Sequence, residues 1–202
     1  MEENKRIGWN DIEEAMSKLY QNQEPIHYAP MIKYSFGGND PLDGINIYDA
    51  VDFYHFVTLG FSEIYEKEND NKEISGFGFE LTYKLKKSNK INEAELKNVA
   101  GVLQTLARYV FDSKRGFYPY EYIATGQTEG MDLAKSSKIV GFVTIEDPLL
   151  KTINTVNGEV QFVELIGATY EELNQIINHE KTKEEVINEI LSKYSDITDY
   201  DR

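Results

Sequence analysis

The sequence contains no cysteine and only three histidines among 202 residues. The absence of cysteine excludes disulfide scaffolds, thiolate zinc sites and thiol nucleophiles. No apolar run approaches the roughly 18 residues that a membrane-spanning helix needs. The first ten residues are polar and contain no apolar segment typical of a secretory signal. We therefore expect a cytoplasmic protein that does not associate with membranes.

Basic residues are also scarce: the sequence has 21 lysines and arginines and 35 acidic residues, which gives a net charge of −14. Proteins that bind nucleic acid obtain much of their affinity from basic side chains on phosphates. A chain of this charge repels nucleic acid and anionic lipid and attracts a basic protein at long range. The excess charge therefore predicts no nucleic-acid partner and favours a basic protein partner. An ordinary role in solubility is the alternative.

The histidines do not form a recognisable active site. His179 is followed by Glu180, but Lys183 occupies the position of the second histidine in a zinc-protease motif. His179 is instead expected in the last turn of a helix, where a cation suits the helix dipole. His27 and His55 lie in segments that resemble strands, and no nucleophile-elbow sequence accompanies them. We predict no catalytic, cofactor-binding or metal-binding residues, and a hydrolase using His55 remains an alternative.

Four helices are predicted from capping residues and apolar spacing. The first begins at Asn10 and ends before Pro25, and the others cover about 92–111, 170–179 and 183–194. Their capping pairs are Asn10 with Glu13, Asn92 with Glu95, Thr169 with Glu172, and Thr182 with Glu185.

Strands are predicted between these helices from β-branched and aromatic residues and from period-two alternation. They cover 45–48, 53–59, 76–85, 139–146, 150–156 and 160–166, after an extended segment at 26–34 and with one short strand within 113–130. Asn157 and Gly158 predict a hairpin with a type I′ turn. The order of elements indicates a single α+β domain over residues 1–202, with a mixed, mainly antiparallel sheet and a helical C-terminus at about 170–194.

Several separated blocks of the sequence resemble the Suppressor of fused (SUFU-like) family. They are GWNDIEEAMSKLYQNQEPIHY, GGNDPLDGINIY, YHFVTLGFSEIYEKE, SGFGFELTYKL, LQTLARYVF and EDPLLKTINTVNGEVQFVELIGATYEEL. The resemblance implies a single-domain binding module without enzymatic activity or cofactor. It also implies that the matching residues are structural, namely Asp43, Gly44, His55, Gly60, Ser62, Tyr65, Gly76, Gly78, Glu80, Asp147 and Pro148.

Short bacterial members of this family resemble immunity proteins, or antitoxins, of polymorphic LXG-type toxin systems. The resemblance therefore implies that this chain neutralises a cognate toxin, a basic nuclease domain, by stoichiometric binding. An acidic loop is the expected contact surface, through Glu63, Glu66, Glu68, Asp70 and Glu73. The acidic tract 171–202 is a second candidate surface. The alternative is a regulatory module that sequesters a transcription factor or a peptide segment added to a sheet edge.

Overall fold

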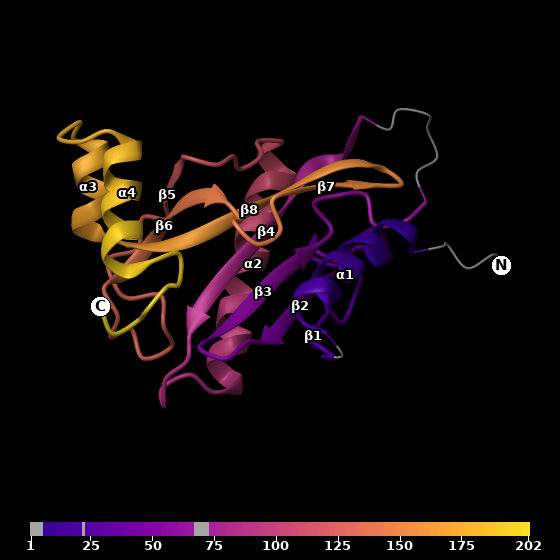
Figure 1. The fold of residues 1–202 in the computed structure, drawn as a ribbon, viewed down its shortest axis with the longest axis horizontal. Coiled ribbons are helices and arrows are strands. Elements are labelled where there is room, and N and C mark those ends of the chain that lie inside the picture. Colours follow the sequence, from indigo (N-terminus) through magenta and orange to yellow (C-terminus); the bar gives the residue numbers. More distant parts are fainter. Residues whose placement is uncertain (1–5, 22, 67–72) are drawn as a thin grey trace.

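The protein is described by a computed structural model that covers residues 6–21, 23–66 and 73–202 (Figure 1). The helices are α1 (Ile7–Leu19), α2 (Glu93–Ser113), α3 (Tyr170–Ile177) and α4 (Lys183–Tyr194), with a 3-10 turn at Tyr34–Phe36. The strands are β1 (Ile26–Tyr28), β2 (Gly44–Asp49), β3 (Phe53–Leu59), β4 (Ile74–Lys86), β5 (Tyr122–Ala124), β6 (Ile139–Glu146), β7 (Thr152–Thr155) and β8 (Gly158–Thr169).

All eight strands form one sheet in the order β1-β2-β3-β4-β8-β6-β5, and β7 pairs with β8 as a hairpin. Every pairing is antiparallel except the central one, in which β4 and β8 run parallel. The predicted α+β domain with a mixed, mainly antiparallel sheet is therefore confirmed. Among the described residues, no helix is both long and apolar enough to cross a bilayer.

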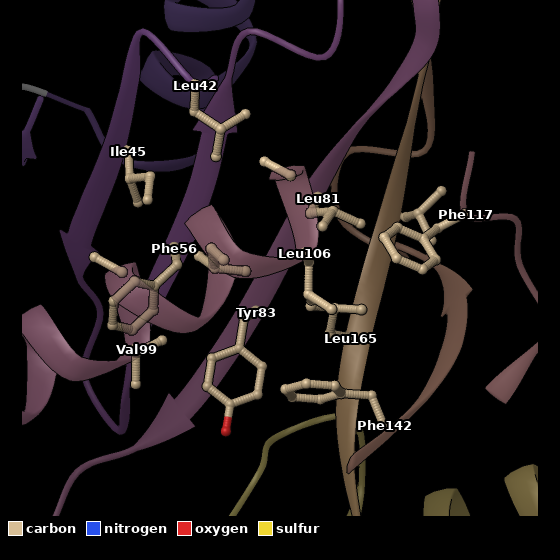
Figure 2. Packing of buried hydrophobic residues seen from close by; sticks show 14 of the residues in the cluster. Leu42, Ile45, Phe56, Leu81, Tyr83, Val99, Leu106, Phe117, Phe142 and Leu165 are labelled. Carbon is tan, nitrogen blue, oxygen red and sulfur yellow. The ribbon is translucent and has the colours of Figure 1, made fainter. Parts of the chain in front are cut away.

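The two faces of the sheet are covered differently. Helix α2 packs on one face through Leu96, Val99, Leu103 and Val110, against side chains from the central strands. Figure 2 shows side chains of this cluster from the strands and from α2 pointing toward one another. The opposite face carries α1 at one end and the α3–α4 pair at the other, each with a separate apolar cluster (Figure 1). The middle of that face is thus left to other residues.

Local signals account for most helix boundaries. The side chain of Asn92 accepts a hydrogen bond from the backbone of Glu95, as its position predicts. Thr169 and Thr182 each form a complete capping box with the glutamate three residues later. Such caps satisfy backbone N–H groups that the first turn of a helix leaves without a partner.

The predicted cap of the first helix is wrong, because α1 begins at Ile7 and Asn10 lies inside it. Arg6 occupies the capping position and makes no side-chain cap. The backbone N–H of Trp9 instead donates to the carbonyl of Ile64, 3.0 Å away. A tertiary contact thus satisfies a donor that a local cap would otherwise take.

The hairpin between β7 and β8 is confirmed, but its turn differs from the prediction. Thr155 pairs with Gly158, so the two loop residues are Val156 and Asn157. A type I′ turn needs positive φ at both central residues. Only Gly158, at 122°, has a positive φ in this segment, and the Asn157 side chain donates to the carbonyls of Glu63 and Tyr65 instead.

Candidate functional site

A buried cluster of charged and polar side chains fills the middle of the sheet face between α1 and the α3–α4 pair. It contains His55 of β3, Lys84 of β4, Glu164 of β8 and Asp147, which follows β6. All four side chains are at most 1% exposed. Successive side chains alternate between the two faces of a strand, so the apolar residues next to these in the strand sequence point toward α2. The sheet is therefore apolar on one side of β4 and ionic on the other.

Asp147 is held from several directions. Its Oδ1 accepts hydrogen bonds from the backbone of Leu149 and Leu150, at 2.8 and 3.0 Å. Its Oδ2 accepts from the Thr82 hydroxyl at 2.8 Å and lies 3.2 Å from Nε2 of His55. The other ring nitrogen of His55, Nδ1, lies 2.9 Å from the Tyr20 hydroxyl at the end of α1. This chain of contacts ties α1, β3, β4 and the end of β6 together.

Lys84 is the cationic centre of the cluster. Its Nζ donates to Glu164 at 2.9 Å and to Asp196 at 2.7 Å, and it lies 3.9 Å from Asp147. Asp196 belongs to the segment after α4, whose Thr198 forms a parallel bridge to Leu85. Lys84 thereby joins the two central strands to the C-terminal segment.

The carboxylate of Glu80 forms a second buried polar cluster next to the turn after β3. It accepts hydrogen bonds from the Ser62 hydroxyl at 2.6 Å, from the Ser62 and Gly60 backbone at 2.9 and 3.0 Å, and from the Thr58 hydroxyl at 2.7 Å. Burial raises the pKa of Glu80 to about 7, although these hydrogen bonds oppose the shift. Glu80 therefore fixes the backbone of residues 58–62.

Burial also shifts the groups around Lys84. It lowers the pKa of His55, so the ring is neutral, and raises the pKa of Glu164 well above the usual range despite the nearby Lys84. Burial alone would raise the pKa of Asp147 as well. The His55 ring, the Lys84 charge and the Thr82 hydrogen bond outweigh that effect and hold the pKa of Asp147 well below its usual range.

The residue types in this cluster resemble those of a catalytic site, but solvent does not reach them. His55 and Asp147 are fully buried and line none of the clefts described below. Among the described residues, the His55 ring is therefore covered on all sides, which removes the geometric support for a hydrolase built on that residue. Within residues 6–21, 23–66 and 73–202, no group of three or more acidic or histidine side chains is arranged to hold a metal ion.

The other two histidines lie on the surface. His27 Nδ1 is 2.7 Å from the side-chain oxygen of Asn46 on the neighbouring strand. His179 lies beyond the end of α3 with a φ of 58°, so its predicted place in the last helical turn is wrong. The helix ends two residues earlier, at Ile177.

The family-motif residues outside the charged cluster gather at one end of the sheet. Tyr65 donates to Asp43 at 3.2 Å, and Gly44 leaves room for the ring of His27, which a Cβ would approach within 2.4 Å. Gly60, Gly76 and Gly78 have positive φ values of 136°, 58° and 83°. Pro148 is exposed after β6.

The predicted acidic contact surface is described only in part. Glu66 and Glu73 are exposed and Glu63 is half-buried, whereas Glu68 and Asp70 lie outside the described residues. In the other acidic tract, Asp196, Asp199 and Asp201 form ion pairs with Lys84, Lys86 and Lys90. Three of the carboxylates in that tract are therefore paired with lysines of the domain, and only the pair with Lys84 involves a buried lysine.

A groove of about 590 Å³ opens beside the first of these surfaces. Its apolar lining includes Tyr34, Phe36, Pro41, Phe61, Ile64, Tyr65, Phe77 and Phe111. Lys33 crosses one side, where its Nζ donates to the Tyr65 hydroxyl at 2.6 Å and lies 3.5 Å from Asp43. A second cleft, of about 680 Å³, lies between α3, α4 and the segment around Gly130.

The sequence alone did not predict that Lys84, Glu164 and Asp196 contact one another. Glu80, Thr82 and Lys84 alternate with apolar residues, a pattern typical of a strand with one solvent-exposed face. Glu164, inside the apolar run of β8, was the signal that a buried partner for a lysine existed.

The fold and these clusters define a class of α+β domain in which one mixed sheet carries a buried ionic cluster on the face opposite its main helix. The chain belongs to the Suppressor of fused protein (SUFU) family, whose sequence pattern matches residues 38–202. It is 31% identical over 171 residues to the human Suppressor of fused homolog and 30% identical to the mouse protein. Each match covers 78% of this chain and 34% of the relative, so the chain spans about a third of their length.

Solved structures agree with this assignment. A chain of the Sufu-Fu complex crystal structure matches with a TM-score of 0.84 and 26% identity, over 98% of this chain and 91% of that one. Drosophila Suppressor of Fused matches equally well, over 98% of this chain and 50% of its own. A SUFU homolog from Neisseria gonorrhoeae shares the fold alone, with a TM-score of 0.60 and 12% identity over 91% and 88% of the two chains.

Proposed function

We propose that this chain is an immunity protein that neutralises a cationic toxin domain, a nuclease, by stoichiometric binding in the cytoplasm. The observation that carries the proposal is the net charge of −14 on a SUFU-family domain. A nuclease needs a basic cleft for its substrate, and an acidic protein is attracted to the same cleft. Opposite charges also accelerate the encounter, which matters when a free toxin is lethal.

The burial of the ionic cluster supports binding over catalysis. His55, Asp147, Lys84 and Glu164 contact one another and not solvent. Their contacts with one another therefore maintain the fold, and a partner meets the carboxylates on the surface instead. Of the two acidic surfaces, we propose the loop from Glu63 to Glu73 as the contact, because its sequence has five acidic and two basic residues.

Co-expression tests the proposal directly. The chain is produced with and without the toxin domain encoded next to its gene, and survival and complex formation are scored. We expect rescue and a one-to-one complex. A toxic neighbour that is neither bound nor neutralised would overturn the proposal.

The charge mechanism has its own test in two matched variants. In one, Glu66, Glu68, Asp70 and Glu73 are changed to their amides, and in the other Glu171, Glu180, Glu184 and Glu189 are changed in the same way. We expect the first to slow association by about tenfold or more at low salt and to flatten its salt dependence. The second removes equal charge and should have a smaller effect. Equal effects would show that net charge alone matters.

A regulatory binding module is the second candidate. The structural match to a chain of the Sufu-Fu complex, which covers 98% of this chain, favours this function. Strand β5 is a short edge strand whose Tyr122 is exposed, so a peptide segment could extend the sheet there. Binding of a transcription factor or a disordered peptide, with no toxin encoded nearby, would support this function over immunity.

A further inference from the structure

The loop before β2 exposes several large apolar side chains within six residues. Met31 is fully exposed, and the exposed fraction is 80% for Phe36, 59% for Ile32 and 46% for Tyr34. Isolated apolar residues are common on protein surfaces, but a contiguous group marks a site of interaction. This group borders the groove described above, because Tyr34 and Phe36 also line it.

The loop that presents these side chains is held in one conformation. The backbone N–H groups of Phe36 and Gly38 donate to the carbonyl of Lys33, at 2.9 and 3.1 Å. Gly37 has a φ of 86°, and a Cβ on Gly38 would lie 2.0 Å from the carbonyl oxygen of Ile32, so both positions need glycine. The ring of Tyr34 packs edge-on against Phe111 of α2, with centroids 5.4 Å apart. A preorganised loop loses little entropy when a partner binds.

The groove is suited to cations as well as to apolar groups. Lysines of the chain itself already lie over its aromatic rings: Lys33 is 5.1 Å from the Tyr65 centroid, and Lys114 is 5.8 Å from that of Phe111. Aromatic faces attract lysine and arginine in this arrangement. Two carboxylates, of Asp43 and Glu63, line the groove against one amine, that of Lys33. Glu66, Glu73, Asp112 and Lys114 lie within three positions of lining residues in the sequence, as do Asp40 and Arg108, which pair with each other.

We propose that Met31, Ile32, Phe36 and the adjoining groove form the docking surface for a cationic protein segment. A large apolar side chain of the partner enters the groove, and its lysine or arginine neighbours meet the carboxylates in and near the groove. This inference rests on the proposed function, since the toxin domain is the partner that supplies such a segment. It places the apolar anchor of the complex beside the acidic loop.

Two exposed positions and a matched control test the surface. Met31→Glu with Phe36→Glu should weaken binding of the purified toxin domain by about 100-fold or more, since central apolar anchors dominate interface energies. Val51→Glu adds the same kind of charge at a side chain that is 90% exposed, in the turn between β2 and β3, and should change affinity by less than about threefold. Equal losses, or no loss in the double variant, would overturn the inference.

A second measurement keeps the groove testable if the toxin domain does not bind. Methyl-labelled protein is titrated with a synthetic helical peptide of leucine and lysine, and then with its leucine–glutamate counterpart. We expect the lysine peptide to shift the Met31 and Ile32 methyl signals and leave those of Val51 and Ile177 in place, and the glutamate peptide to bind far more weakly.

Three results would contradict the docking surface in that titration. They are equal shifts at Val51, equal binding of the glutamate peptide, and concentration-dependent shifts without peptide, which would identify a second copy of the chain as the occupant. Selective binding of the lysine peptide together with a toxin domain that fails to bind would uphold the surface and overturn the proposed function.

Discussion

Replacing Lys84 by methionine removes the one cation that contacts Asp147, Glu164 and Asp196 in the described structure. The side chain is 1% exposed, so water does not replace the lost partner without local rearrangement. Methionine fills similar space but leaves several carboxyl groups facing one another. Breaking a buried ion pair by removing one partner costs about 3–5 kcal/mol. We expect a loss of that size in the free energy of unfolding.

Lys86→Met is the matched control. Lys86 lies two residues along the same strand and also pairs with the C-terminal segment, through Asp199 at 2.7 Å, but its side chain is 55% exposed. Exposed pairs contribute about 0–1 kcal/mol, so this variant should stay close to the wild type. Adding Glu164→Gln to Lys84→Met should recover part of the loss, because it removes a carboxylate that the first change leaves without a counter-ion.

Urea unfolding at pH 7, followed by far-UV circular dichroism and by fluorescence of the single tryptophan, Trp9, measures these differences. The penalty of Lys84→Met should shrink as the pH falls from 7 to 5, since uncompensated carboxylates have raised pKa values in the folded state and take up protons. A Lys84→Met variant within 1 kcal/mol of Lys86→Met would refute the reasoning, because the cluster would then be solvated in solution.

Two further predictions concern buried backbone and carboxyl groups. Because the pKa of Glu80 is raised from 4.5 to about 7 in the folded state, its contribution to stability falls as the pH rises through that interval. Glu80→Gln, which mimics the protonated form, should therefore gain on the wild type by about 3 kcal/mol between pH 4.5 and 8 in urea unfolding, and parallel pH profiles would contradict this. Gly76→Ala should destabilise the domain by more than about 2 kcal/mol in thermal unfolding, since Gly76 has a φ of 58° and its Cβ would lie 2.6 Å from the carbonyl oxygen of Phe61. Gly101→Ala, in α2 with open space around it, should instead stabilise by about 0.5–1 kcal/mol, and similar effects of the two changes would contradict the backbone argument.

The helices and strands were largely predictable because their signals are local. Asn92, Thr169 and Thr182 cap the helices that they were predicted to cap, and the strand predicted at 139–146 has those bounds. The start of α1 was not predictable, because the carbonyl that receives the Trp9 N–H belongs to Ile64. No pattern near Asn10 contains that information.

The ionic cluster and the groove were not predictable for the same physical reason. Lys84 and Asp196 are separated by 112 positions and meet only because the C-terminal segment lies beside the end of β4. Alternation in β4 predicts which side chains share a face, but not that the polar face is covered. The groove likewise forms from the segments around Lys33, Phe61, Gly76 and Phe111, which only the folded sheet and α2 bring together.

The parallel pairing of β4 with β8 has a consequence for how the chain folds. Leu81 pairs with Val163, so the centre of the sheet joins residues 82 positions apart, and these pairings close a loop that contains α2, β5, β6 and β7. Contacts of such long sequence separation slow folding, because the entropy of loop closure is lost before the contacts form. During synthesis, β1 to β4 must wait with one edge of β4 unpaired until β8 has emerged from the ribosome. We therefore expect the domain to fold late and as one cooperative unit.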